Sequence, residues 1–211
     1  MEPIGGILFE PVGCLADFPV EPFQAIAAEL GRQIKPTRSA SRIYWHLLHS
    51  LQSASLQQRE TIEALEQQAV SQSSLYEDVV PALSQLRAMG IQLLLASSLS
   101  DGAVERFIGA NALAPFFTAV RGRTSAHGVQ SAPLRGALEA AQITPEQVVF
   151  LTDTAEGMET ARRAGVRSVL MMNDPDESKR LAQRNPAGGV ISLIELPDFA
   201  RFLLAQTARP T

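Results

Sequence analysis

The chain has 211 residues, of which 45% are hydrophobic and 19% charged, proportions that exclude a disordered or disulfide-stapled protein and predict a buried core. Its 18 basic and 22 acidic residues leave a net charge of −4 without a basic stripe, which disfavours nucleic-acid binding because phosphate neutralisation supplies most of that affinity. The lone Cys14 cannot form an internal disulfide, and the apolar runs are far shorter than the about 20 residues that span a bilayer. The N-terminal residues lack the basic and apolar regions of a secretory signal, so none is expected. We therefore expect a cytoplasmic protein with neither a nucleic-acid nor a membrane partner.

Short apolar runs alternate with helical patterns over most of the chain. The first run, Ile4–Phe9, stops at Glu10-Pro11 as a buried strand does. Further strands are expected at Ile91–Ala96, Phe117–Val120, Val148–Leu151 and Ser168–Met172, with helices at Val79–Met89, Gly102–Ile108, Ala132–Ala141 and Ala155–Ala164. Gly90 and Gly165 directly follow two of these helices, where a positive φ is wanted. The alternation predicts an α/β fold with a doubly wound parallel sheet.

A different pattern separates the first strand from Tyr76. Three helices without an intervening strand are predicted there, at Pro22–Leu30, Ser41–Leu51 and Leu56–Val70. We expect a small all-helical cap domain over residues 18–75, inserted into a core domain of residues 1–17 and 76–211, with Gln67–Ser74 as an exit linker. The C-terminal part is expected to add a short helix at Glu177–Gln183, an edge strand at Gly189–Ile191 and a closing helix at Leu196–Ala205.

Ligands of open parallel sheets bind outside the carboxyl ends of the strands. The segments at those ends are Glu10–Leu15, Ser97-Ser98, Val120–Gly128 and Thr152–Gly157. Their order and spacing, together with the helical insert, resemble the haloacid dehalogenase-like superfamily, in particular its phosphoglycolate phosphatase-type members with a helical cap after strand one. The resemblance covers roughly residues 4–172 and implies a Rossmann-like core.

The resemblance also implies roles for the residues after the first strand. In the family, one aspartate attacks phosphorus and a second, two residues later, transfers protons. Glu10 stands at the first position and Val12, which cannot transfer a proton, at the second; Gly13 matches, and Cys14 replaces a threonine. The family's lysine position falls near Gly128, and only Arg121, Arg123 and Arg135 are close enough in sequence to substitute for it.

Other features of the family site are retained. Ser97 occupies the hydroxyl position that binds a phosphoryl oxygen, and Asp153 the position of a magnesium-binding aspartate. The resemblance implies phosphate binding by Gly13, Cys14, Ser97, Ser98 and Arg123, and weak Mg²⁺ binding by Glu10, Asp153 and the Val12 carbonyl, whose oxygens suit a hard cation.

Structural interpretations of the same residues stay open. Ser97 also suits a strand end, Asp153 also suits the N-cap of the helix at Ala155, and a lone cysteine such as Cys14 is usually a small buried hydrophobe. Glu156 fits an exposed helix face.

Three functions are compatible with these residues. We expect a hydrolase-family pseudoenzyme of the phosphatase type, impaired or inactive, that is retained for binding a small phosphorylated ligand or a protein partner. The alternatives are an active Mg²⁺-dependent phosphomonoester hydrolase with atypical chemistry, and a phosphate-binding or scaffold protein of the same architecture.

Overall fold

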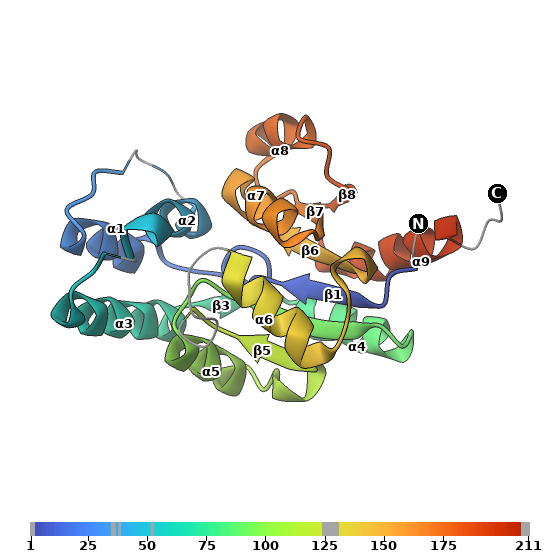
Figure 1. Ribbon diagram of the computed structural model, residues 1–211, viewed down its shortest axis with the longest axis horizontal. Coiled ribbons are helices and arrows are strands. Elements are labelled where there is room, and N and C mark those ends of the chain that lie inside the picture. The colour runs from blue at the N-terminus through green and yellow to red at the C-terminus, as the bar shows by residue number, and fades with distance from the viewer. Residues whose placement is uncertain (1–2, 35–36, 38, 52, 124–130, 208–211) are drawn as a thin grey trace.

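A six-stranded parallel sheet lies at the centre of the computed structural model, which describes residues 3–34, 37, 39–51, 53–123 and 131–207 (Figure 1). The strand order is β5-β4-β1-β6-β7-β8. The strands span Gly6–Phe9 (β1), Gln92–Ala96 (β4), Ala119–Arg121 (β5), Val148–Thr152 (β6), Arg167–Met171 (β7) and Gly188–Val190 (β8). The predicted doubly wound α/β sheet is therefore confirmed, and β8 is its edge strand as expected.

Helices cover both faces of this sheet. The core helices are α4 (Val79–Ala88), α5 (Asp101–Ala110), α6 (Ser131–Ala141), α7 (Ala155–Ala164), α8 (Pro175–Ala182) and α9 (Leu196–Thr207), with 3-10 turns at Ala114–Phe116, Pro145–Gln147 and Leu193–Glu195. Helices α6 and α7 contact each other and the strands beneath them, whereas α4 packs with α9. Gly90 and Gly165 have φ of 78° and 77°, which confirms the predicted helix ends. Within the described ranges, no helix is long and apolar enough to cross a membrane.

Strand β1 occupies the middle of the sheet because it is apolar along its whole length. It pairs in parallel with β4 on one side and β6 on the other. All four of its residues are buried, as expected for a strand covered on both faces. The residue that follows β1 is therefore placed at the centre of the carboxyl edge, between the ends of β4 and β6.

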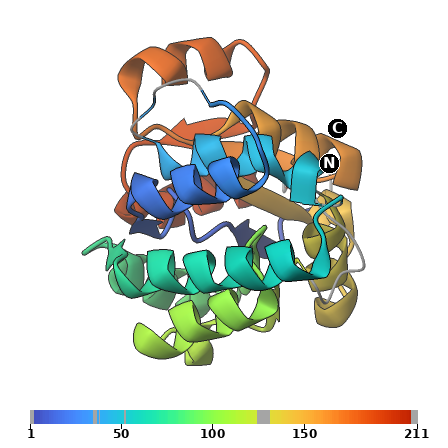
Figure 2. The same cartoon turned by 90° about the vertical axis from the view of Figure 1, so that its left-hand side faces the viewer.

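The insert after β1 consists of α1 (Val20–Glu29), α2 (Ala40–Leu51) and α3 (Leu56–Ser71), which lie together in front of the sheet in Figure 2. Its two connections to the core pair with each other: β2 (Ala16–Asp17) runs antiparallel to β3 (Ser74–Leu75). Strands of two residues are too short to produce a periodic pattern, which is why the sequence did not predict them.

One expectation about the insert is wrong. The predicted linker Gln67–Ser74 belongs largely to α3, which continues to Ser71 because Ala69 and Val70 are buried. Its glutamines and serines suggested a linker, whereas Ala69 and Val70 belong to the predicted helix Leu56–Val70, which the structure confirms and extends by one residue. The division into core and cap domains at residues 18 and 76 remains a prediction.

Gly157 in α7 supplies a test of how closely this helix packs on β6. A Cβ at Gly157 would lie 1.9 Å from Thr152 Oγ1 and 3.0 Å from Thr154 Oγ1. We expect Gly157→Ala to lower the free energy of unfolding by about 1–3 kcal/mol in urea titrations, because the buried backbone must shift. Gly109→Ala in α5 is the matched control, since a Cβ there meets nothing within 4 Å, and we expect it to stabilise the protein by up to about 1 kcal/mol. Equal effects of the two changes would contradict the packing described.

Candidate active site

The candidate site lies where β1, β4 and β6 end. Glu10, Ser97 and Asp153 each follow one of these three adjacent strands directly. The sequence analysis predicted that these residues share one edge of the sheet, and the hydrogen bonds described below bring Glu10 and Ser97 into direct contact.

Glu10 is buried, with 2% of its surface exposed. Ser97 Oγ donates to Glu10 Oε1 (2.7 Å), and the Ser98 backbone N–H donates to Oε2 (3.2 Å). Burial raises the pKa of Glu10 to about 8, although these hydrogen bonds oppose the shift, and the nearby charge of Asp153 adds to the rise. The carboxyl is therefore mostly neutral at pH 7. It accepts hydrogen bonds from Ser97 and Ser98, the two residues expected to bind phosphoryl oxygens.

Asp153 is held by a residue of the insert. Ser41 Oγ in α2 donates to Asp153 Oδ2 (2.6 Å), whereas Oδ1 is buried and has no hydrogen-bond partner among the described residues. Burial raises the pKa of Asp153 to about 6. The N-cap of α7 is Thr154, whose side chain accepts from Gly157 N. The interpretation of Asp153 as that cap is therefore wrong.

Gly13 is required by the geometry of the loop after β1. Its φ is +80°, and a Cβ would lie 2.5 Å from Asp153 Oδ2 and 3.1 Å from Ser41 Oγ. Only glycine adopts this conformation without strain and leaves room for the Asp153–Ser41 contact. Gly13 therefore lies directly against Asp153, and its expected role in phosphate binding remains a prediction.

Cys14 and Val12 place their side chains in the hydrophobic core. Both are buried, and Cys14 Sγ donates to the Leu151 carbonyl at 3.6 Å. Burial raises the pKa of the thiol, which disfavours the thiolate that a nucleophile needs. The Cys14 side chain is therefore a small buried hydrophobe, and the phosphate-binding role expected for it is not supported.

Arg123 binds the insert instead of an open phosphate site. Its Nη1 donates to Glu66 Oε1 in α3 (2.6 Å) and to the Ser98 carbonyl (2.8 Å). The Tyr44 hydroxyl in α2 donates to the same Glu66 oxygen (2.6 Å), and the Ser100 backbone N–H donates to Glu66 Oε2 (2.9 Å). We call these groups the Arg123–Glu66 cluster. The charge of Arg123 thus already has a fully buried carboxylate partner, and the phosphate-binding role expected for it remains a prediction.

Three residues of the insert contribute to these contacts without having been predicted: Ser41, Tyr44 and Glu66. Glu66 carried a usable signal, because it follows Ile62 by four residues and therefore falls on the apolar stripe of α3. A carboxylate on a buried helical face requires a partner. Ser41 and Tyr44 carried no comparable signal.

The other arginines weighed as substitutes for the family's lysine have partners elsewhere. Arg121 Nη1 donates to the Val120 carbonyl and Arg135 Nη2 to the Arg163 carbonyl, both at 2.8 Å. The lysine position itself, near Gly128, lies outside the described residues.

The carboxylates of Glu10 and Asp153 are not arranged as the expected Mg²⁺ site in this structure. Both Glu10 oxygens accept hydrogen bonds, and one Asp153 oxygen does so, which leaves Asp153 Oδ1 as the free carboxylate oxygen. Across the described ranges, no group of three or more His, Cys, Asp or Glu side chains is arranged to hold a metal ion. Weak Mg²⁺ binding remains a prediction, and it requires Glu10 to ionise, since its pKa is about 8.

Comparison with known proteins identifies the family. Residues 22–171 match the family model described as haloacid dehalogenase-like hydrolase. The match spans more than half of the chain, and the parallel sheet with a helical insert after β1 agrees with it. The chain therefore belongs to the haloacid dehalogenase-like hydrolase family.

Individual relatives are more distant. Enolase-phosphatase E1 of Monosiga brevicollis is 30% identical over 113 residues, which are 52% of this chain but only 38% of that protein. A predicted phosphatase from Clostridium acetobutylicum has a TM-score of 0.74 at 16% identity, covering 95% of this chain and 100% of that one. A putative phosphoglycolate phosphatase from Lactobacillus plantarum has a TM-score of 0.72 at 14% identity, covering 93% and 99%. At these identities the two structures show the fold alone.

The raised pKa of Glu10 predicts a pH dependence of stability. Because the folded-state pKa of about 8 lies above the ordinary 4.5, the stabilising preference for protonated Glu10 is present at low pH and is lost as the pH rises through 8. Thermal and urea unfolding from about pH 5 to about pH 9 should show wild-type stability falling by a few kcal/mol, with a smaller fall in Glu10→Gln.

The variant Asp153→Asn separates the effect of Asp153 on stability from that of Glu10. The pKa of Asp153, about 6, lies above the ordinary 3.8, so the stability that protonated Asp153 contributes is lost by about pH 6. Asp153→Asn should therefore still lose stability between pH 6 and 8, because that loss belongs to Glu10. Parallel stability curves for wild type and Glu10→Gln would contradict the protonation assigned to Glu10.

Removing one partner of the Arg123–Glu66 cluster is expected to lower the free energy of unfolding strongly. Glu66→Ala leaves a mostly buried guanidinium without its carboxylate, and we expect a loss of about 3–5 kcal/mol in unfolding free energy. Glu60→Ala, an exposed change on the same helix, should alter it by no more than about 0.5 kcal/mol. The double change Glu66→Leu with Arg123→Met should cost less than Glu66→Ala alone, because no unpaired charge remains. A loss in Glu66→Ala as small as in Glu60→Ala would argue against the cluster.

Proposed function

We propose that this family member is strongly impaired in phosphoryl transfer and is retained for binding a small phosphorylated ligand or a protein partner. One observation carries the proposal: the Glu10 carboxyl itself accepts the hydrogen bonds of Ser97 Oγ and Ser98 N. Glutamate is one methylene longer than the aspartate of the family. The side chain at the nucleophile position therefore fills the place where the phosphoryl oxygens of a substrate would be bound.

The chemistry of the substituted residues supports the same proposal. A buried and mostly neutral carboxyl is a poor nucleophile, and misplacement by about 1 Å costs on the order of 10²-fold in rate. Val12 cannot act as general acid or base, which costs roughly a further 10²–10⁴-fold. The two losses are not strictly additive, because groups of one catalytic unit act together.

Contacts between insert and core also favour a binding role. Asp153 is bound to Ser41, and Arg42 Nη2 forms ion pairs with Asp174 and Glu177, each at 3.4 Å. With the Arg123–Glu66 cluster, these contacts hold α2 and α3 against the sheet edge. Glu10 itself is only 2% exposed, so little of its carboxyl is open to a substrate in this arrangement.

A second candidate is an active phosphomonoester hydrolase that uses Glu10 in another rotamer. The observation in its favour is the unpartnered, buried Asp153 Oδ1, which is available to a cation or to a donor brought by a ligand. This candidate requires Glu10 to give up the hydrogen bonds to Ser97 and Ser98 and to ionise.

Phosphatase assays separate the two candidates. With p-nitrophenyl phosphate and Mg²⁺, we expect no turnover by the wild type above that of Glu10→Gln. We expect the combination Glu10→Asp, Val12→Asp and Gly128→Lys to gain activity, because it restores the nucleophile, the acid/base group and the cation of the family. Circular dichroism and thermal unfolding must first establish that this variant is folded, since Val12 is buried. Wild-type turnover near ~1 s⁻¹ that disappears in Glu10→Gln would favour the second candidate.

A further inference from the structure

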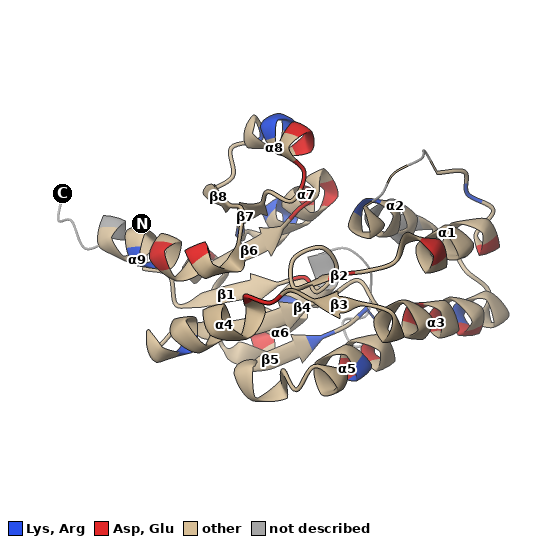
Figure 3. Ribbon diagram, turned by 180° about the vertical axis from the view of Figure 1, so that it is seen from behind, with Lys and Arg blue, Asp and Glu red and all other residues tan. Residues whose placement is uncertain are grey.

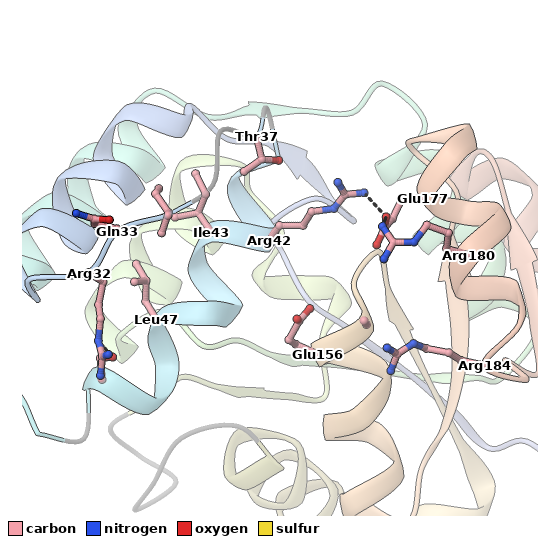
Figure 4. Close-up of a pocket in the computed structure, with 13 residues that line it drawn as sticks. Arg32, Gln33, Thr37, Arg42, Ile43, Leu47, Glu156, Glu177, Arg180 and Arg184 are labelled. Carbon is pink, nitrogen blue, oxygen red and sulfur yellow. Dashed lines mark hydrogen bonds and ion pairs between the residues drawn. The ribbon is translucent and has the colours of Figure 1, made fainter.

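A cavity of about 800 Å³ lies between the insert and the C-terminal part of the core (Figure 4). One wall comes from α2, with Ile43 and Leu47, and from the described residues Arg32–Ile34 and Thr37. The other comes from the start of α7, from α8 and from Arg184, which follows α8. The volume is within the range of about 300–1,000 Å³ that small-molecule sites occupy. Glu10, Gly13 and Ser97 do not line it, so it is distinct from the site described above.

The charge of this cavity is positive. Arg32, Arg42, Arg180 and Arg184 line it, against two acidic residues, Glu156 and Glu177. Glu177 already pairs with two of these arginines, Arg42 at 3.4 Å and Arg180 at 3.0 Å. Figure 3 shows the same mixture of basic and acidic residues along α8. Arg42 also pairs with Asp174 at 3.4 Å, so Arg42 and Arg180 are balanced by two carboxylates, and the excess of positive charge comes from the other two arginines.

The remaining two arginines have no acidic partner among the described residues. Arg32 Nε donates to Ser50 Oγ at 2.7 Å, a neutral acceptor. The Arg184 side chain has no described hydrogen bond or ion pair, and its guanidinium points into the cavity from the end of α8 (Figure 4). A guanidinium offers a planar set of donors that matches carboxylate and phosphate oxygens in bidentate geometry.

We propose that this cavity binds a small organic anion with an apolar body, whose carboxylate or phosphate group is held by Arg184. The apolar body would rest on the side of Ile34, which is only partly buried, and Arg32 would add positive charge on that same wall. This proposal names the class of ligand for the binding role proposed above. It rests on that proposed function, because the ligand must not be hydrolysed. A polymeric anion does not suit the site, because the cavity is limited in size and carries two carboxylates.

Calorimetry with defined probes tests this assignment. Phenylphosphonate combines an apolar ring with a phosphate-like dianion that no phosphatase releases as phosphate, benzoate carries a carboxylate instead, and benzyl alcohol has the ring without a charge. We expect the two anions to bind at low salt, more tightly than benzyl alcohol, and to weaken as salt is added. Arg184→Gln should reduce the anion affinity roughly tenfold or more, the loss expected for a charge-assisted hydrogen bond.

Arg106→Gln is the matched control, because Arg106 is an exposed arginine on α5 that does not line the cavity. The Arg106→Gln variant should bind the two anions with the affinity of the wild type. Both variants change exposed side chains, and thermal unfolding would verify that they are folded. Equal anion affinity in Arg184→Gln and wild type, no detectable binding of either anion, or equally tight binding of benzyl alcohol would overturn the assignment.

Phosphate release from phenyl phosphate distinguishes a failure of this inference from a failure of the proposed function. Rapid release by the wild type would contradict catalytic impairment, whatever Arg184→Gln does to phenylphosphonate binding. Slow release together with Arg184-independent binding would overturn the cavity assignment alone.

Discussion

The carboxyl of Glu10 is buried at the end of the central strand, and a carboxyl in that position needs hydrogen-bond donors within reach. Ser97 Oγ and Ser98 N supply them, which fixes the loop after β4 against β1. The other side of the same loop presents the Ser98 carbonyl and the Ser100 N–H to Arg123 and Glu66. One short loop therefore connects the buried carboxyl of the core with the buried ion pair of the insert.

The sheet edge and the cavity thus differ in whether their polar groups are free to bind a ligand. At the sheet edge, polar groups of the phosphatase-type site are bound to one another: Glu10 to Ser97, and Asp153 to Ser41. On the side of α7 and α8, arginines face a cavity with fewer carboxylates than guanidinium groups. Charge that is already neutralised locally contributes little to binding, whereas Arg184 is available for an anion. Loss of the reaction and retention of ligand binding are therefore physically compatible in this chain.

The position of the loops after the strands could be predicted from the sequence, but the contacts of their side chains could not. That Glu10, Ser97 and Asp153 meet follows from topology, because each ends a strand and the three strands are neighbours in a parallel sheet. Which groups they contact did not follow, because a side chain's partners depend on rotamers and on segments far away in the chain. Ser41 lies 112 residues from Asp153 and Glu66 lies 57 residues from Arg123. For the same reason, the sequence did not predict that Arg123 contacts Glu66, and its binding of phosphate remains a prediction.

By itself, the sequence determined the α/β alternation, the helical insert after β1, the glycines that end α4 and α7, and the presence of Glu10 and Val12 directly after β1, where the family resemblance implies two aspartates. These features depend on local periodicity, on φ-tolerant residues and on side-chain chemistry, all of which are readable along the chain. Only the tertiary structure decided that Glu10 is buried and bound to the loop after β4, that α2 and α3 supply Ser41, Tyr44 and Glu66, and that Arg184 faces a cavity. The physical reason is that burial and pairing depend on how distant segments pack against one another, and no local pattern records that packing.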